Sequence, residues 1–188
     1  LVALAQVDGG IDAAPRPLFP DLEEMLRATA RDLNRQGVRH GERGQLRKAI
    51  RAFEQARGLS PHDAEIINNY GYARFLNGQY ELAIAAYREA LRIQPGRGVA
   101  FENLAEALMR PDASATELTE AREALLQARR LGRAAPRLSL LLARLAVRRG
   151  RIREAEQAYA ERLEGGAPDD PLALELGDFY RDHGKRDR

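Results

Sequence analysis

Residues 64–97 read AEIINNYGYARFLNGQYELAIAAYREALRIQPGR, and this stretch decides the fold. Its apolar and small residues recur at the three- and four-residue spacing of amphipathic helices. Asn77-Gly78-Gln79 divides the pattern into two halves with a tight-turn sequence. Pro95 ends the second half, because a proline inside a helix loses a hydrogen bond and clashes with the preceding turn. The stretch therefore predicts two helices that pack back to back.

Small residues mark the faces on which these two helices would meet. Gly71 in the first helix has no side chain and forms a notch. Ala83 and Ala90 in the second helix are small, and Tyr87 lies between them. We expect the tyrosine ring to fill the gap between two closely packed helices.

The order of these residues resembles the tetratricopeptide repeat, a helix–turn–helix unit with a period of about 34 residues. The resemblance is carried by Tyr70, Gly71, Gly78, Ala83, Tyr87, Ala90 and Pro95. The same register divides the chain into repeats at about 30–63, 64–97, 98–133 and 136–169, with a partial or capping repeat at 170–188. One such unit cannot bury its apolar faces alone. The resemblance therefore implies an all-α, right-handed superhelical solenoid over residues 21–188.

Two further features follow from this register. Gly37 and Gly177 occupy the position of Gly71 in their repeats, so we expect packing notches there as well. Residues 111–116 separate the two expected helices of the third repeat and are longer than the other turns. This segment predicts a surface loop.

Composition limits the function classes that the sequence supports. The 188-residue chain is 44% hydrophobic and rich in alanine, leucine, arginine and glutamate, a mixture that favours helix. It contains no cysteine, which excludes a disulfide framework, a thiolate zinc site and a cysteine nucleophile. The formal net charge of +2 is too small to indicate nucleic acid by itself. No apolar run reaches the ~18 residues that a membrane span requires.

The first twenty residues differ from the rest of the chain. They carry Gly9-Gly10 and three prolines without a helical period, which predicts an extended lead-in over 1–20. Ala3-Leu4-Ala5 has the small-x-small form that signal peptidase cleaves, so these residues could be the remnant of an export signal. The alternative is an arbitrary boundary in an alanine-rich protein. The pattern slightly favours an exported or periplasmic protein over a cytoplasmic one.

In tetratricopeptide repeat proteins the first helices line a concave surface that holds a partner segment. The resemblance therefore implies a groove, to which Val38 contributes in the first repeat. The other expected lining residues are Asn34, Asn68, Asn69, Tyr72, Phe75, Glu102, Asn103, Glu106, Met109, Arg137, Leu140, Arg144 and Arg148. Within each helix these positions lie three, four or seven residues apart, so each set shares one face.

Two features of this lining indicate how a partner could be held. Tyr72 and Phe75 expose aromatic surface where the fold does not need it, which predicts an anchor pocket unless the lead-in or the helix of the first repeat covers them. Asn69 and Asn103 share a register in adjacent repeats. In related proteins asparagine at this place holds a bound peptide backbone, which suits an amide with both donor and acceptor, although asparagine is common there in any case.

A third feature is an arginine-rich segment near the middle of the second half of the chain. Residues 124–153 contain nine arginines and no aspartate or glutamate. Arg137, Arg144 and Arg148 fall on the expected concave face, and guanidinium groups pair with carboxylates in bidentate geometry. An acidic partner segment is one interpretation. A solvated basic face, or pairing of these arginines with Glu102 and Glu106 of the neighbouring helix, is the other.

The sequence predicts no enzyme, cofactor or metal site. His40, His62 and His183 fall in different repeats and have no fixed carboxylate or nucleophile partner. The chain contains no HExxH, no GxSxG and no phosphate-cradling glycine loop. Nucleic acid is not expected either, because Glu102 and Glu106 on the concave face would repel a phosphate backbone.

A narrower resemblance connects residues 65–185 with the helical-repeat pilotins of type IV pilus secretins. Asn68-Asn69-Tyr70-Gly71 followed by Val99 and by Phe101-Glu102-Asn103-Leu104 is similar to that family, as is the Gly165-Gly166 loop. Those proteins are outer-membrane lipoproteins that escort a secretin subunit to its assembly site. This chain departs from them because it lacks their lipidated cysteine.

Together these observations predict a non-catalytic adaptor that binds a peptide or a helical segment of a partner protein in a concave groove. One alternative is a chaperone or pilotin-like assembly factor for a secreted or cell-envelope component. The other is the interaction arm of an enzyme whose catalytic domain lies outside this chain.

Overall fold

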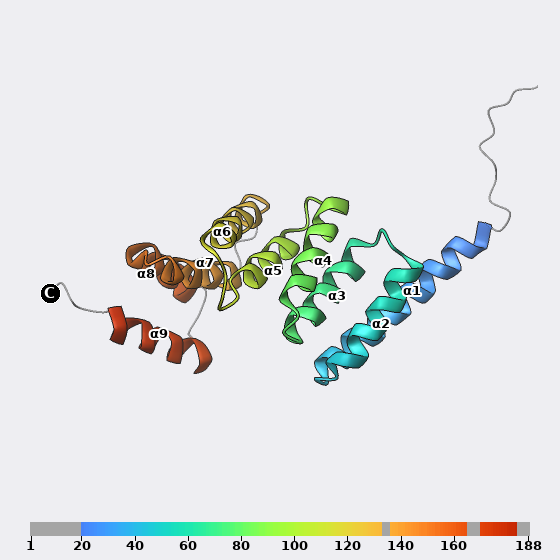
Figure 1. Cartoon of the computed structure of the whole chain (residues 1–188), viewed down its shortest axis with the longest axis horizontal. Coiled ribbons are helices and arrows are strands. Elements are labelled where there is room, and N and C mark those ends of the chain that lie inside the picture. The colour runs from blue at the N-terminus through green and yellow to red at the C-terminus, as the bar shows by residue number, and fades with distance from the viewer. Residues whose placement is uncertain (1–19, 133–135, 165–169, 184–188) are drawn as a thin grey trace, which may run out of the picture.

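The structure is a computed structural model that describes residues 20–132, 136–164 and 170–183. The described residues form nine helices and no strand. The helices are α1 (Pro20–Glu42), α2 (Leu46–Leu59), α3 (Ala64–Leu76), α4 (Tyr80–Ile93), α5 (Gly98–Leu108), α6 (Ala115–Arg130), α7 (Pro136–Arg148), α8 (Ile152–Glu164) and α9 (Asp170–His183). They follow one another in an elongated row from α1 at one end to α9 at the other (Figure 1). The fold is the all-α helical-repeat solenoid that the sequence predicts.

Short turns pair the helices into hairpins. In the α3–α4 turn, Gly78 has a φ of 74°, in the left-handed region that residues with a Cβ atom seldom adopt. The N–H group of Gly78 donates to the carbonyl oxygen of Phe75 at 2.9 Å and closes the turn. Gly44 and Gly150 take the same place in the α1–α2 and α7–α8 turns, with φ values of 69° and 67°. Glycine therefore makes these turns short enough for each helix to pack against the next.

The connection between α5 and α6 is a longer loop, as the sequence predicts. It covers residues 109–114, whereas residues 77–79 suffice between α3 and α4. The loop ends in a capping box: the Ser114 hydroxyl accepts from the N–H of Glu117, and the Glu117 carboxylate accepts from the N–H of Ser114. This cap begins α6 at Ala115, so the loop lies two residues earlier than the sequence pattern places it.

Two of the three predicted glycine notches are occupied by aromatic rings. A Cβ atom added to Gly71 would lie 2.8 Å from the Tyr87 ring and 3.2 Å from the Ala86 side chain. A Cβ atom added to Gly37 would lie 2.5 Å from the Phe53 ring. The distances to the two rings are too short for real contacts, so glycine is required where the ring of the second helix meets the first.

The third predicted notch is wrong. A Cβ atom added to Gly177 in α9 would meet nothing within 4 Å among the described residues. Gly37 and Gly71 each face a ring from the helix that follows their own, and no described helix follows α9. Gly177 thus keeps the register of a notch without the ring that would fill it.

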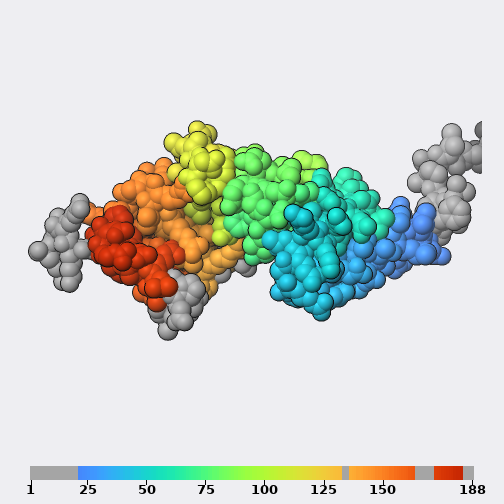
Figure 2. Space-filling view, turned by 60° about the horizontal axis from the view of Figure 1, so that its bottom comes forward, coloured from blue at the N-terminus to red at the C-terminus, as the bar shows by residue number. Residues whose placement is uncertain are grey.

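The apolar core is distributed along the solenoid. One cluster, which includes Leu108, joins α4, α5, α6 and α7. A second, around Phe53, joins α2, α3 and α4, and a third, around Tyr159, joins α7, α8 and α9. Figure 2 shows the blue-to-cyan first pair and the red α9 at opposite ends of the molecule, with the other helices between them. Each helix pair therefore depends on its neighbours for burial.

Ion pairs repeat along the outer helices at a constant sequence spacing. The outer ion-pair ladder consists of Arg57–Glu89 at 2.7 Å, Arg88–Glu120 at 2.7 Å and Arg129–Glu161 at 2.9 Å. Each pair joins residues 32 positions apart, so each connects one helix pair with the next. Because these charges lie at the surface, exposed or half-buried, each pair contributes only ~0–1 kcal/mol to stability.

In the described part of the chain, none of the helices combines the length and the apolar character needed to cross a membrane.

Candidate functional site

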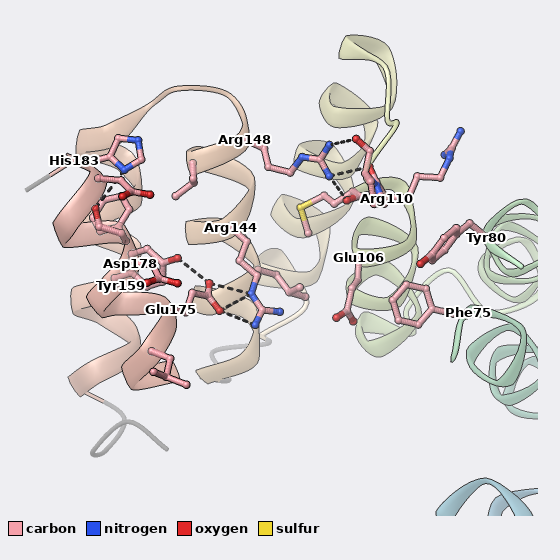
Figure 3. A pocket seen from close by; sticks show the side chains of 17 residues that line it. Phe75, Tyr80, Glu106, Arg110, Arg144, Arg148, Tyr159, Glu175, Asp178 and His183 are labelled. Atoms are coloured by element: carbon pink, nitrogen blue, oxygen red, sulfur yellow. Dashed lines mark hydrogen bonds and ion pairs between the residues drawn. The ribbon is translucent and has the colours of Figure 1, made fainter. Parts of the chain in front are cut away.

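A groove of about 720 Å³ lies between the α3–α4 hairpin, α5, α7 and α9 (Figure 3). We call it the central groove. Its apolar lining consists of Phe75, Tyr80, Met109, Pro111, Leu141, Val147, Leu174 and Phe179. Its polar and charged lining consists of Glu106, Arg110, Arg144, Arg148, Tyr159, Glu175, Asp178, Asp182 and His183. The groove therefore combines apolar surface with charges of both signs.

The sequence predicts part of this lining. Phe75, Glu106, Met109, Arg144 and Arg148 belong to the expected set and line the central groove. They come from α3, α5 and α7 or lie at the ends of these helices, as the resemblance implies. The structure thus brings five of the expected residues together at one site.

Three aromatic side chains form a row at the edge of the groove. The ring centroids of Tyr72 and Phe75 lie 6.4 Å apart with nearly parallel planes, and those of Phe75 and Tyr80 lie 5.7 Å apart edge to face. We call these residues the aromatic row. Tyr72 is 43% exposed, so neither the helix of the first repeat nor any other described segment covers it. Aromatic pairs at these distances hold their rings in fixed relative positions.

Tyr72 also faces a second, smaller hollow of about 390 Å³ between α1 and α3. Val38, Asn69 and Leu76 line this hollow beside it, and all three occupy exposed or half-buried positions. Of these, Val38 and Asn69 belong to the expected lining. The aromatic row therefore connects the small hollow with the central groove.

Side-chain amides link the first helices of successive pairs. The Asn69 amide donates to Asn34 at 3.1 Å, and the Asn68 amide donates to Asn69 at 3.4 Å. The Asn103 amide donates to Asn68 at 3.0 Å, and the Arg137 guanidinium donates to Asn103 at 2.9 Å. We call this series the polar ladder. It runs from α1 through α3 and α5 to α7.

The polar ladder corrects the predicted role of several residues. Asn34, Asn68 and Asn103 are only 8%, 4% and 5% exposed, and Glu102 is fully buried. The sequence pattern places these four side chains on the groove lining, whereas they lie between repeats. Asn103 in particular donates to Asn68, accepts from Arg137 and is buried, so its amide is not presented to a peptide backbone in the groove. Among the predicted asparagines, Asn69 alone remains half-buried beside a hollow.

Arg137 pairs with the neighbouring helix. Its guanidinium lies 2.6 Å from the Glu106 carboxylate and 3.6 Å from that of the buried Glu102. We call Arg137, Arg144 and Arg148 the arginine stripe. Its pairing with Glu102 and Glu106, one of the two interpretations of the sequence, is present at Arg137. The charge of Arg137 is matched within the protein before any partner binds.

The other two arginines of the stripe are also engaged. Arg144 makes a two-pronged ion pair with Glu175 of α9, with its shortest contact at 2.8 Å (Figure 3). This contact raises the pKa of Arg144. Arg148 donates to the carbonyl oxygens of Met109, Arg110 and Pro111, at the end of α5 and in the following loop. One arginine fixes α9 to α7, and the other fixes the α5–α6 loop to α7.

Tyr159 completes the attachment of α9. Its hydroxyl donates to the Glu175 carboxylate at 2.8 Å, so Glu175 holds contacts from α7 and α8 at once. Burial, together with this hydrogen bond, raises the pKa of Tyr159 far above its usual range. The tyrosine therefore stays a neutral donor at all physiological pH values.

Sequence reasoning missed the contribution of α9. Leu174, Glu175 and Asp178 line the central groove. Relative to Gly177, they occupy the same sequence positions that Asn68, Asn69 and Tyr72 occupy relative to Gly71. Extending the register to the fifth helix of this type would have found them. Leu140 is a correction in the opposite direction: it is predicted to line the groove, but it is half-buried and packs against the core cluster of α7, α8 and α9.

The histidines make local contacts. His40 Nδ1 lies 2.9 Å from the Gln45 side-chain oxygen, and His183 Nδ1 lies 3.3 Å from the carbonyl oxygen of Phe179. Across residues 20–132, 136–164 and 170–183, no three histidine, cysteine, aspartate or glutamate side chains are grouped so that they could hold a metal ion. The groups gathered at the groove are suited to stacking, apolar contact and ion pairing.

Comparison with protein families gives a direct match to the architecture described above. The tetratricopeptide repeat family matches residues 34–97 and 113–171, which together make up well over half of the chain. The chain belongs to the tetratricopeptide repeat family. Tetratricopeptide repeats are in general a non-catalytic protein-interaction fold, so membership supports an interaction scaffold. A search among curated proteins finds no match.

Several solved tetratricopeptide repeat structures are similar to this one. A thermophilic repeat protein of Thermus thermophilus has a TM-score of 0.72 at 20% identity, over 82% of this chain and 83% of that one. MamA of Desulfovibrio magneticus RS-1 has a TM-score of 0.68 at 17% identity, over 83% and 86%. The first repeat domain of Spaghetti, solved with the HSP90 peptide SRMEEVD, has a TM-score of 0.61 at 15% identity, over 66% and 95%. At these identities the likeness establishes the fold.

Proposed function

We propose that this chain is a non-catalytic interaction scaffold that binds an extended or helical segment of a partner protein in the central groove. The observation that carries the proposal is the aromatic row, whose rings are exposed or half-buried at the edge of a groove of about 720 Å³. Binding pockets of ~300–1,000 Å³ with aromatic anchors and a few polar groups are the usual form of a recognition site.

The Spaghetti repeat domain supports the proposal by analogy. It has the same fold and holds an HSP90 peptide in its solved structure. A solenoid of this type can therefore hold a short segment of another protein without a further domain. The chemistry of the segment bound by this chain depends on its own groove residues.

Position-specific photo-crosslinking tests the proposal. A photoreactive phenylalanine analogue is placed at Tyr80 in the groove or at Leu82 on the same helix, and each protein is expressed in cells that produce the natural one. Leu82 is 47% exposed and lies outside the groove, so it is a matched control. We expect a protein crosslink from position 80 and none from position 82. Equal crosslinking at both positions, or crosslinking at position 82 alone, contradicts the proposal.

The aromatic row provides a second test in the same assay. Replacing Tyr72 and Phe75 with alanine should remove the crosslink from position 80 while circular dichroism still shows a helical protein. Phe75 also packs against the core cluster around Leu108, so a thermal melt must accompany the assay. The single Tyr72→Ala variant, which alters an exposed ring, separates lost recognition from lost stability.

A further inference from the structure

The arginines of the central groove are occupied before a partner arrives. Arg144 is held by Glu175, and Arg148 is held by three backbone carbonyl groups. Arg110 lies 2.7 Å from the Glu117 carboxylate and 3.2 Å from that of Asp112. A carboxylate of a bound segment would have to replace these contacts, so the gain from a new ion pair would be offset by the loss of an existing one.

The charge of the groove also disfavours an acidic segment. Its lining contains four carboxylate residues, Glu106, Glu175, Asp178 and Asp182, and three arginines, Arg110, Arg144 and Arg148. The carboxylates thus outnumber the guanidinium groups, and the groove offers no excess of positive charge. Each of these carboxylates is paired with an arginine, Glu106 with Arg137, Glu175 with Arg144, and Asp178 and Asp182 with Arg181. An acidic segment would therefore find no uncompensated positive charge to attract it.

The groove also presents accessible apolar side chains. Phe75 and Tyr80 line one side of the groove, and α9, which carries Leu174, lies on the opposite side (Figure 3). Met109 and Val147 also line the groove. Leu174 is 71% exposed, the largest exposure among the exposed large apolar residues of the described chain. Covering such side chains removes apolar surface from water at ~25 cal/mol per Å². A segment gains most here by placing aromatic or aliphatic side chains against them.

We infer that the segment bound in the central groove is anchored by aromatic or long aliphatic side chains and carries no cluster of aspartate or glutamate. This deepens the proposed function and rests on it. The arginine stripe that suggests an acidic partner in the sequence serves instead to join α5, α7 and α9. Recognition is then left to the aromatic row and to the apolar residues that face it.

A random peptide library displayed on phage tests this inference with the full chain. The library is selected on the wild-type protein and, in parallel, on Tyr80→Glu and Leu82→Glu. Tyr80 is the first residue of α4, where a carboxylate is favourable to the helix, so Tyr80→Glu places a charge in the groove. A thermal melt of this variant measures the effect on stability of losing the ring contact with Phe75. Leu82→Glu places the same charge on the same helix outside the groove.

We expect the wild type and Leu82→Glu to enrich the same aromatic and aliphatic sequences. Synthetic copies of these peptides should bind Tyr80→Glu about tenfold more weakly or worse, and raising the salt concentration should change their affinity for the wild type little. Enrichment of acidic sequences that lose affinity at high salt would overturn the inference and leave the proposed function standing. If no sequence is enriched by the wild type over Tyr80→Glu, both the proposed function and the inference fail.

Discussion

The side-chain amide of Asn103 in α5 donates a 3.0 Å hydrogen bond to the side-chain oxygen of Asn68 in α3, 35 residues earlier in the chain. Both residues are buried, so water does not replace this bond when one partner is removed. The bond therefore connects two neighbouring repeats through their first helices.

Replacing either asparagine with leucine should destabilise the protein. We expect Asn68→Leu and Asn103→Leu each to lower the free energy of unfolding by ~1–3 kcal/mol, because the remaining amide stays buried without its partner. The double variant should lose less than the sum of the two single losses. Urea denaturation measures all three. Asn77→Ala, at an exposed position, is the control and should change stability by no more than ~0.5 kcal/mol. Strict additivity of the two leucine variants would contradict the coupling.

The glycine notches predict a second difference in stability. Gly71→Leu should lower the free energy of unfolding by ~1–3 kcal/mol, because its side chain would overlap the fully buried Tyr87 ring. Gly177→Leu introduces the same side chain into α9, where the described structure leaves space. We expect the second variant to be as stable as the wild type within ~1 kcal/mol. Equal thermal melts for Gly71→Leu and the wild type would show that the notch is not tightly packed.

The cap of α6 predicts a dependence of stability on pH. The backbone N–H and the hydroxyl of Ser114, followed by Arg110, lower the pKa of Glu117 from its ordinary value of 4.5 to about 2. The pKa of Glu117 is lower in the folded state than in the unfolded state. Its contribution to the free energy of unfolding is therefore fully present above pH 4.5 and is lost as the pH falls toward 2. The stability difference between the wild type and Glu117→Gln should therefore shrink over this range in urea titrations.

Ser114 supplies the control for this measurement. The Ser114→Ala variant lacks the hydroxyl that helps to lower the pKa of Glu117, so the pH dependence should become weaker in this background. An unchanged pH dependence in Ser114→Ala would assign the effect to another carboxylate.

Removing α9 should expose the end of the solenoid. A chain that ends at Glu164 lacks Leu172, Leu176 and Phe179, which cover the core cluster around Tyr159. We expect this shortened chain to bind a hydrophobic dye and to aggregate in sedimentation velocity experiments. Leu174→Ala, which alters an exposed residue of α9, should leave both measurements unchanged. A shortened chain that stays monomeric and melts like the wild type would show that α9 is dispensable for packing.

The fold could be predicted because its requirements are local in the sequence. The turn at Gly78 needs a positive φ, and the contact between Gly71 and Tyr87 needs a missing side chain opposite a ring. Both requirements are met by residue identities within one repeat, so the pattern in residues 64–97 is sufficient to define the unit. Repetition of that pattern then predicts the stacking.

The candidate site could be predicted only in part, because its lining depends on contacts between repeats. Asn68 and Asn69 are consecutive, yet Asn68 bonds to Asn103 of the following repeat and Asn69 to Asn34 of the preceding one, and the periodicity of a single helix does not assign these partners. The position of α9 against α7 lets Leu140 pack, half-buried, against the core cluster around Tyr159, and it adds Leu174 and Glu175 to the groove. The partners of these asparagines and the residues that line the groove depend on the packing angle between helix pairs. The periodicity within one helix does not determine that angle.

The spacing of the outer ion-pair ladder has a consequence for how the chain acquires its structure. Each of its three pairs closes a loop of 32 residues, and each bond of the polar ladder between neighbouring repeats closes one of 34 or 35. Closing short loops costs little entropy, and chains with mainly short-range contacts fold quickly. During synthesis, each hairpin can therefore dock onto its predecessor as soon as it leaves the ribosome, and the solenoid grows from its first helix without waiting for its last.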